Sequence, residues 1–88
     1  MILNNQFEII NVADEYILVP VGDQVLKFSG VVAITDATAY LLEKMRVNKS
    51  EDELVRLLTE EYDVDAMTAR ADINETMKKL LDIGVISE

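Results

Sequence analysis

The hydrophobic pattern of this chain changes period once, close to residue 35, and this change determines the class of fold. From residue 7 to residue 35, apolar residues form short runs rich in Val and Ile, as strands do. From Asp36 onward they recur every three or four residues, as they do on one face of a helix. Strands followed by helices predict an α+β domain.

Three short segments of the first part are predicted to form an antiparallel sheet. They are residues 7–12 (FEIINV), 16–20 (YILVP) and 31–35 (VVAIT). In residues 7–12, every second residue from Phe7 onward is expected on one face. Pro20 has no N–H for a ladder and should end its strand. Residues 21–24 indicate a turn, while residues 25–30 (VLKFSG) fit either a short strand or an irregular crossing.

Three helices are expected after residue 35, each preceded by a residue that can cap it. The candidate caps are Thr35 or Asp36, Ser50, and Asp65. Ser50 and Glu53 match the capping box, in which each side chain bonds a backbone N–H. The second helix should end near Glu61 and the third at Gly84, before a brief extended segment at residues 85–87.

Apolar stripes on these helices are expected to face the core. They consist of Ala37, Tyr40, Leu41 and Met45 in the first helix, Leu54, Leu57, Leu58 and Tyr62 in the second, and Ala66, Ala69, Ile73, Met77 and Leu80 in the third.

The absence of Cys and His removes most catalytic and metal-binding chemistry. The three glycines are isolated and make no phosphate-binding loop. The carboxylates of residues 51–53 fit a helix start, and those of residues 60–65 lack the spacing of a calcium-binding loop. We expect no enzymatic activity, no cofactor and no metal.

The charge of the chain excludes several kinds of partner. Its 17 acidic and 8 basic residues give a net charge of −9, which opposes binding to nucleic acid and to anionic membrane surfaces. No apolar run approaches the ~20 residues of a membrane span, and no signal region precedes the strands. We expect a cytoplasmic protein, with 88 residues making one domain.

The segment from Gly30 to Thr35 raises the question of what covers its second face. It is apolar at Val31–Ile34 and carries none of the charges that protect exposed strand edges. An extended peptide could add to this strand. Alternatively, residues such as Leu26 or Phe28 cover it.

Two further interpretations remain open. A small sheet with three helices fits a winged helix-turn-helix DNA reader, but basic and acidic residues nearly balance on the exposed face of the third helix. These residues are Arg70, Asp72, Asn74, Glu75, Lys78 and Lys79. We therefore keep as the alternative an anionic winged-helix module that acts in transcription through protein contacts, and not a DNA-binding domain. A structural subunit of a larger enzyme is the other alternative.

Two long segments, residues 15–45 and 50–86, carry a family resemblance. The order of elements resembles the PqqD-like family, the precursor-peptide recognition elements of ribosomally made, post-translationally modified peptide pathways. The most telling parts are residues 30–42, 60–65 and 69–86. The chain departs from the family pattern at Ile34-Thr35-Asp36, at Tyr40-Leu41 and in the turn MRVNKS. These departures affect which leader sequence the domain would recognise.

The resemblance implies that residues 1–88 form a single peptide-recognition domain of winged helix-turn-helix type. It implies that the leader of a precursor peptide adds beside the third strand, in the groove between this strand and the third helix. The domain then has no activity of its own and presents the precursor to a modifying enzyme, often a radical S-adenosylmethionine maturase.

Carried onto this sequence, the resemblance assigns a docking edge and a groove wall. The edge consists of Val31, Val32, Ala33, Ile34 and Thr35. The wall includes Ala69, Asp72, Ile73, Thr76, Met77 and Leu80, with the division between core and ligand-facing residues left open.

Three basic residues of the third helix are candidates for contacts with acidic leader residues. They are Arg70, Lys78 and Lys79, although lysines at a helix end also serve the helix dipole and solubility. A free sheet edge also permits homodimers, although we expect a monomer.

Overall fold

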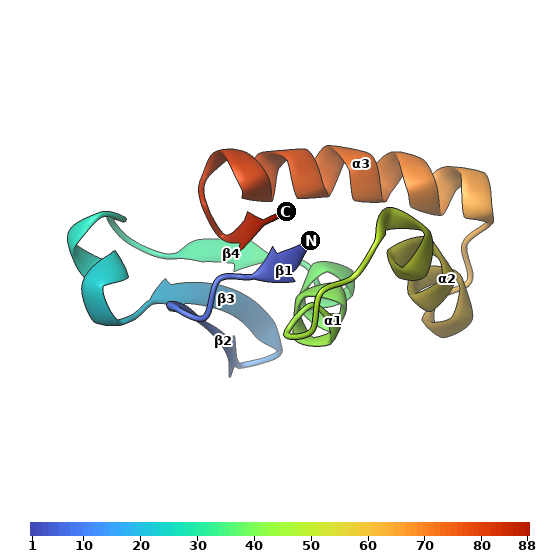
Figure 1. Ribbon diagram of the computed structural model, residues 1–88. Coiled ribbons are helices and arrows are strands. Elements are labelled where there is room, and N and C mark those ends of the chain that lie inside the picture. The colour runs from blue at the N-terminus through green and yellow to red at the C-terminus, as the bar shows by residue number, and fades with distance from the viewer.

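The computed structural model describes residues 1–88 and contains a three-stranded antiparallel sheet followed by three helices (Figure 1). The strands are β1 (Ile2–Leu3), β2 (Phe7–Val12), β3 (Glu15–Pro20), β4 (Val32–Ile34) and β5 (Ile86–Ser87). The helices are the 3-10 helix η1 (Gly22–Leu26), α1 (Asp36–Lys44), α2 (Glu51–Glu61) and α3 (Ala66–Asp82). The sheet has the order β2-β3-β4, so the α+β prediction is confirmed.

The β2–β3 hairpin sets the direction of every backbone group in the sheet. Its two loop residues, Ala13 and Asp14, have φ of 52° and 67°, as in the turns that match strand twist. Val12 and Glu15 flank this loop and form the first hydrogen-bonded pair, and such pairs then alternate along the ladder. Pro20 consequently falls in a non-hydrogen-bonded pair, where its missing N–H costs nothing.

The helix starts are built as the sequence predicts. The Thr68 N–H donates to Asp65 Oδ1 over 2.8 Å, and the Thr38 N–H donates to Thr35 Oγ1 over 3.1 Å. At the capping box, the Glu53 N–H donates to Ser50 Oγ, and the Ser50 N–H donates to Glu53 Oε1. Each bond satisfies a backbone group that the first helical turn leaves unpaired.

The core joins the sheet to all three helices. Its fully buried large side chains are Phe7, Leu18, Leu42, Met45, Leu54, Ile73 and Val85. Two predicted core residues of α1, Ala37 and Tyr40, lie half-buried, whereas Ala39 and Leu42 are buried. Because α1 contacts β3 on one side and β1 and α2 on others, it buries more than one stripe.

In α2 and α3 the buried residues differ slightly from the predicted apolar stripes. In α2, Val55 is buried, while Leu57 and Tyr62 are only half-buried; in α3, Ala66 is exposed. Residues 22–26 form η1 in place of the predicted turn, and residues 27–31 cross irregularly to β4, which is the second of the two alternatives for residues 25–30.

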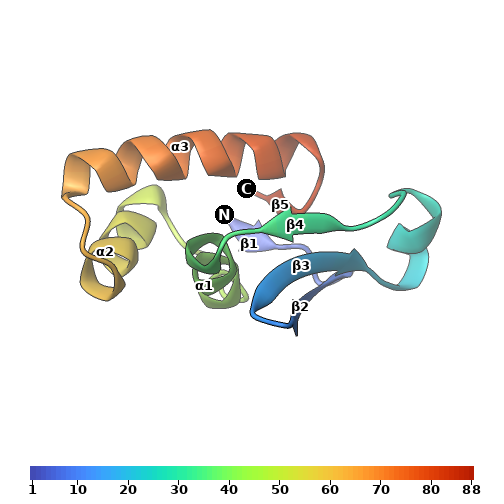
Figure 2. The same cartoon turned by 180° about the vertical axis from the view of Figure 1, so that it is seen from behind.

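A second, two-stranded sheet brings the two ends of the chain together. β1 pairs antiparallel with β5, as Ile2 with Ser87 and Leu3 with Ile86. The extended segment at the end was predicted, but β1 was not, because two residues are too few to show a period. In both views the chain ends lie side by side below α3 (Figures 1 and 2). None of the helices combines the length and apolar character of a membrane-spanning segment.

Candidate functional site

Strand β4 leaves one edge of the sheet open. It pairs with β3 on one side only, and α3 runs along its other side (Figures 1 and 2). In the ladder, Ile34 pairs with Tyr16 and Val32 pairs with Leu18. Because hydrogen-bonded pairs alternate along each ladder from the β2–β3 hairpin onward, both of these pairs are hydrogen-bonded. Ala33 lies between them and therefore directs its N–H and C=O away from β3.

The chain offers no hydrogen-bond partner to this edge. None of the backbone hydrogen bonds formed outside the helices and strands involves residues 29–34, and neither does any side-chain hydrogen bond. The backbone groups of Ala33 therefore face α3 unpaired. Exposed groups of this kind can form a ladder with a further extended chain.

A groove separates β4 from α3. Two adjoining hollows form it, of about 430 Å³ and 310 Å³, which share Thr35, Thr38, Thr76 and Lys79. The larger hollow is completed by Val32, Ala33, Ile34, Leu80 and Ile83. The smaller is completed by Ala37, Leu41, Leu58, Asp72, Ile73 and Glu75. The groove thus combines an unpaired strand edge with a largely apolar hollow.

Most of the predicted site residues meet at this groove. Those that line it are Val32, Ala33, Ile34, Thr35, Asp72, Ile73, Thr76 and Leu80. Val31 precedes β4, is 58% exposed and lines neither hollow. Ala69 and Met77 are 0% and 3% exposed and belong to the core rather than to the groove wall.

Several groove residues were not predicted. Thr38 and Ile83 line the larger hollow, and Ile83 is 40% exposed although it is apolar. On one side of α3, Asp72, Thr76 and Ile83 line the groove at helical spacing. Asp72 and Thr76 each directly precede a buried residue of the core stripe in the sequence. Because this second stripe mixes charged, polar and apolar types, hydrophobic periodicity does not reveal it.

The expected basic cluster does not assemble at the groove. Arg70 turns toward α2, where it donates to Glu51 Oε2 over 2.6 Å and to Asp52 Oδ1 over 2.8 Å. Hydrogen bonds to these two carboxylates raise the pKa of Arg70. Of the three candidates, Lys79 alone lines the groove, and it forms an ion pair with Glu75 at 3.3 Å.

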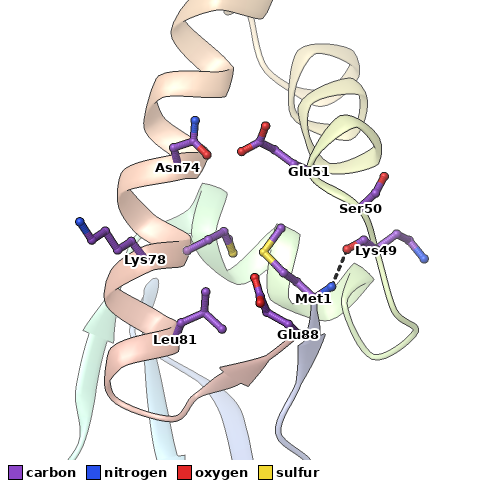
Figure 3. Close-up of a pocket in the computed structure, with 9 residues that line it drawn as sticks. Met1, Lys49, Ser50, Glu51, Asn74, Lys78, Leu81 and Glu88 are labelled. Carbon is purple, nitrogen blue, oxygen red and sulfur yellow. Dashed lines mark hydrogen bonds between the residues drawn. The ribbon is translucent and has the colours of Figure 1, made fainter.

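Lys78 belongs to a different hollow, away from β4. This hollow of about 540 Å³ lies between α3, the start of α2 and the chain ends (Figure 3). The amino group of Met1 donates to the carbonyl of Lys49 there over 2.7 Å. Charges of both signs, from Lys78, Glu51 and Glu88, surround the hollow, and no residue of β2, β3 or β4 lines it. The groove beside β4 is the better candidate site.

The groove presents hydroxyl, charged and apolar side chains beside the backbone groups of Ala33. Its polar side chains are three threonines and the charged residues Asp72, Glu75 and Lys79, and the Thr35 hydroxyl donates to Thr38 Oγ1 over 3.0 Å. No three carboxylates lie close enough together to hold a metal ion. What the groove offers is backbone pairing beside an apolar hollow.

Fold and groove together define a small α+β domain whose sheet ends in an open edge facing a helix. The chain belongs to the PqqD family, because the model of that family, described as coenzyme PQQ synthesis protein D (PqqD), matches residues 15–86. This membership confirms the resemblance seen in the sequence.

The fold also matches a solved structure described as TbiB1 in complex with the TbiA(beta) leader peptide. The TM-score is 0.76 over 100% of both chains, at 16% sequence identity, so the likeness shows a shared fold. A comparison with curated proteins gives no significant match.

Proposed function

We propose that this chain is a peptide-recognition domain that binds the leader of a ribosomally made precursor peptide in the groove between β4 and α3. The observation that carries the proposal is the unpaired backbone of Ala33, facing α3 across an apolar hollow. Family membership and the leader peptide bound to TbiB1 support the same reading.

The leader binds as an added strand. Its backbone pairs with the N–H and C=O of Ala33, and its alternate side chains enter the hollow formed by Val32, Leu80 and Ile83. A net hydrogen bond contributes about 0.5–1.5 kcal/mol, whereas a fully buried apolar side chain contributes about 1.5–3 kcal/mol. Backbone pairing therefore fixes the register, and the apolar side chains supply most of the affinity.

The domain itself performs no chemistry. It holds the precursor as a non-catalytic chaperone and presents it to a modifying enzyme, which we infer to be a radical S-adenosylmethionine maturase. The lack of Cys and His supports a binding role. In this proposal residues 1–88 act as one monomeric domain.

An NMR titration tests where the leader binds. The labelled domain is titrated with the leader half of a small peptide encoded beside its gene, and backbone amide shifts are followed. We expect the shifts to concentrate at residues 31–35 and along residues 72–83. Shifts confined to the hollow around Met1 and Lys78 would move the site, and an unchanged spectrum at near-millimolar leader would overturn the proposal.

A matched pair of substitutions tests strand addition. Ala33→Pro removes the outward N–H but leaves the β3 ladder intact, because proline is tolerated on edge strands. Ala33→Ser changes the side chain and keeps the N–H. We expect the proline variant to bind the leader at least tenfold more weakly, about 1.4 kcal/mol, and the serine variant to bind like the parent. Equal loss in both would argue against backbone pairing at this residue.

A further inference from the structure

The face of the sheet turned away from the core is apolar and uncovered. Cross-strand pairing places Ile10, Ile17 and Ala33 in one row across β2, β3 and β4. Val12 and Val19 extend this row on either side, and Ile10 and Val12 are 38% and 53% exposed. Figure 2 looks onto this face, with β3 and β4 in front of β1 and no other element before them. We call these five residues the outer apolar face.

Carboxylates stand at two opposite corners of the outer apolar face. Glu8 pairs with Val19, and Glu15 pairs with Val12, so the two acidic side chains alternate onto the same face as the apolar row. No Lys or Arg lies in β2, β3 or β4. An apolar strip with acidic corners is complementary to an apolar strip flanked by basic residues.

We propose that the outer apolar face docks the modifying enzyme, through an apolar patch of that enzyme flanked by Lys or Arg. The inference rests on the proposed function and adds the surface by which the loaded domain meets its partner. A second copy is a poor occupant, because each copy carries a net charge of −9 and would bring carboxylates against carboxylates.

The geometry lets both ligands bind together. A leader added at β4 lies in the plane of the sheet, beside α3, whereas the enzyme meets the face of the sheet. The two surfaces adjoin at Ala33, whose backbone belongs to the edge and whose exposed side chain belongs to the outer apolar face. Leader and enzyme are thus brought next to each other, as presentation requires.

Paired variants test the docking face. Ile10→Thr with Val12→Thr makes it polar and keeps β-branched residues in the strand. Val47→Thr is the control, since Val47 is also apolar and 67% exposed but lies between α1 and α2. The probe is the purified modifying enzyme encoded beside this chain's gene, immobilised for binding kinetics. We expect at least tenfold weaker binding for the double variant and no change for Val47→Thr.

Neutralising the corners tests the charge complementarity. Glu8→Gln with Glu15→Gln should slow association with the enzyme several-fold at low salt and flatten its salt dependence, because rim charges act mainly on the association rate. An unaltered rate and salt dependence would contradict a basic rim on the partner.

Leader affinity, measured on the same variants, separates the two proposals. We expect it to stay at the parental value in every variant. The docking face is wrong if the domain binds the leader with parental affinity but does not bind the enzyme. It is equally wrong if the double substitution leaves enzyme binding unchanged. In both cases the proposed leader site is unaffected. If sedimentation shows a dimer that the double substitution dissociates, a second copy covers the face and the docking proposal is wrong.

Discussion

Single side chains hold the starts of α2 and α3: Ser50 and Glu53 each accept a hydrogen bond from the other's backbone N–H, and Asp65 accepts one from the Thr68 N–H. Ser50, Glu53 and Asp65 were predictable because a cap and its partner lie three residues apart. Arg70 was not, because its partners Glu51 and Asp52 lie on another helix, 19 and 18 residues away. The partner of a surface charge depends on how the helices pack, and the local sequence pattern does not show this.

The capping box at Ser50 and Glu53 should make the thermal stability of the domain depend on pH in the acidic range. Hydrogen bonds from the backbone N–H and the side chain of Ser50 lower the pKa of Glu53 below that of an ordinary glutamate. A carboxyl with a lowered folded-state pKa stabilises the fold above its unfolded pKa, and this contribution disappears as the pH falls through the folded value. We expect Glu53→Gln to lower Tm at pH 7 and to make the loss of Tm below about pH 4.5 shallower.

Thermal unfolding followed by circular dichroism between pH 7 and pH 3 measures this effect. Glu60→Gln is the control, because Glu60 lies in the same helix, caps nothing, and forms only an exposed ion pair with Arg56 at 3.8 Å. Parallel pH profiles for the parent and Glu53→Gln would show that the capping carboxylate carries no linked stability.

At the element scale, the sequence predicted what repeats and missed what does not. β2 was predicted from its alternation, β3 and β4 from short runs rich in Val and Ile, and the three long helices from a period of 3.6, while η1 and β1 are too short to display a period. The open edge was signalled by the uncharged residues of β4. On α3, hydrophobic periodicity marks only the buried stripe through Ile73 and Leu80, so the groove residues Asp72 and Thr76 were predicted from the family resemblance and not from the period.

Ile83 is an apolar residue of the groove wall. It follows the last residue of α3, lines the larger groove hollow and is 40% exposed, so a bound leader can cover it. We expect Ile83→Ser to weaken leader binding by about 1–2 kcal/mol, roughly five- to thirtyfold, with little effect on folding. Met67→Ser is the control, since Met67 lies at the far end of α3 and is 84% exposed.

Isothermal titration with the leader gives both affinities, and urea unfolding gives both stabilities. Equal leader affinity for the two variants would remove Ile83 from the binding surface and narrow the groove to the residues nearer Thr76.

For the whole molecule, the decisive link is the one between the chain ends. The Leu3 N–H donates to the Met45 carbonyl over 2.9 Å, and the Asn4 N–H donates to the Val85 carbonyl over 2.8 Å. β1 thereby ties the end of α1 to the segment that leaves α3. Since β4 and α3 form the two groove walls, their relative position depends on this link as well as on the core.

Leu3→Ala tests the link between the chain ends. Leu3 is 6% exposed within the core, so its truncation should lower the free energy of unfolding by about 2–4 kcal/mol. Val47→Ala, at an exposed apolar position, should change it by less than about 0.5 kcal/mol. Urea unfolding followed by circular dichroism measures both, and leader titration on the folded protein shows whether the groove loosens. A loss below about 1 kcal/mol would mean that the core holds α3 against the sheet without β1.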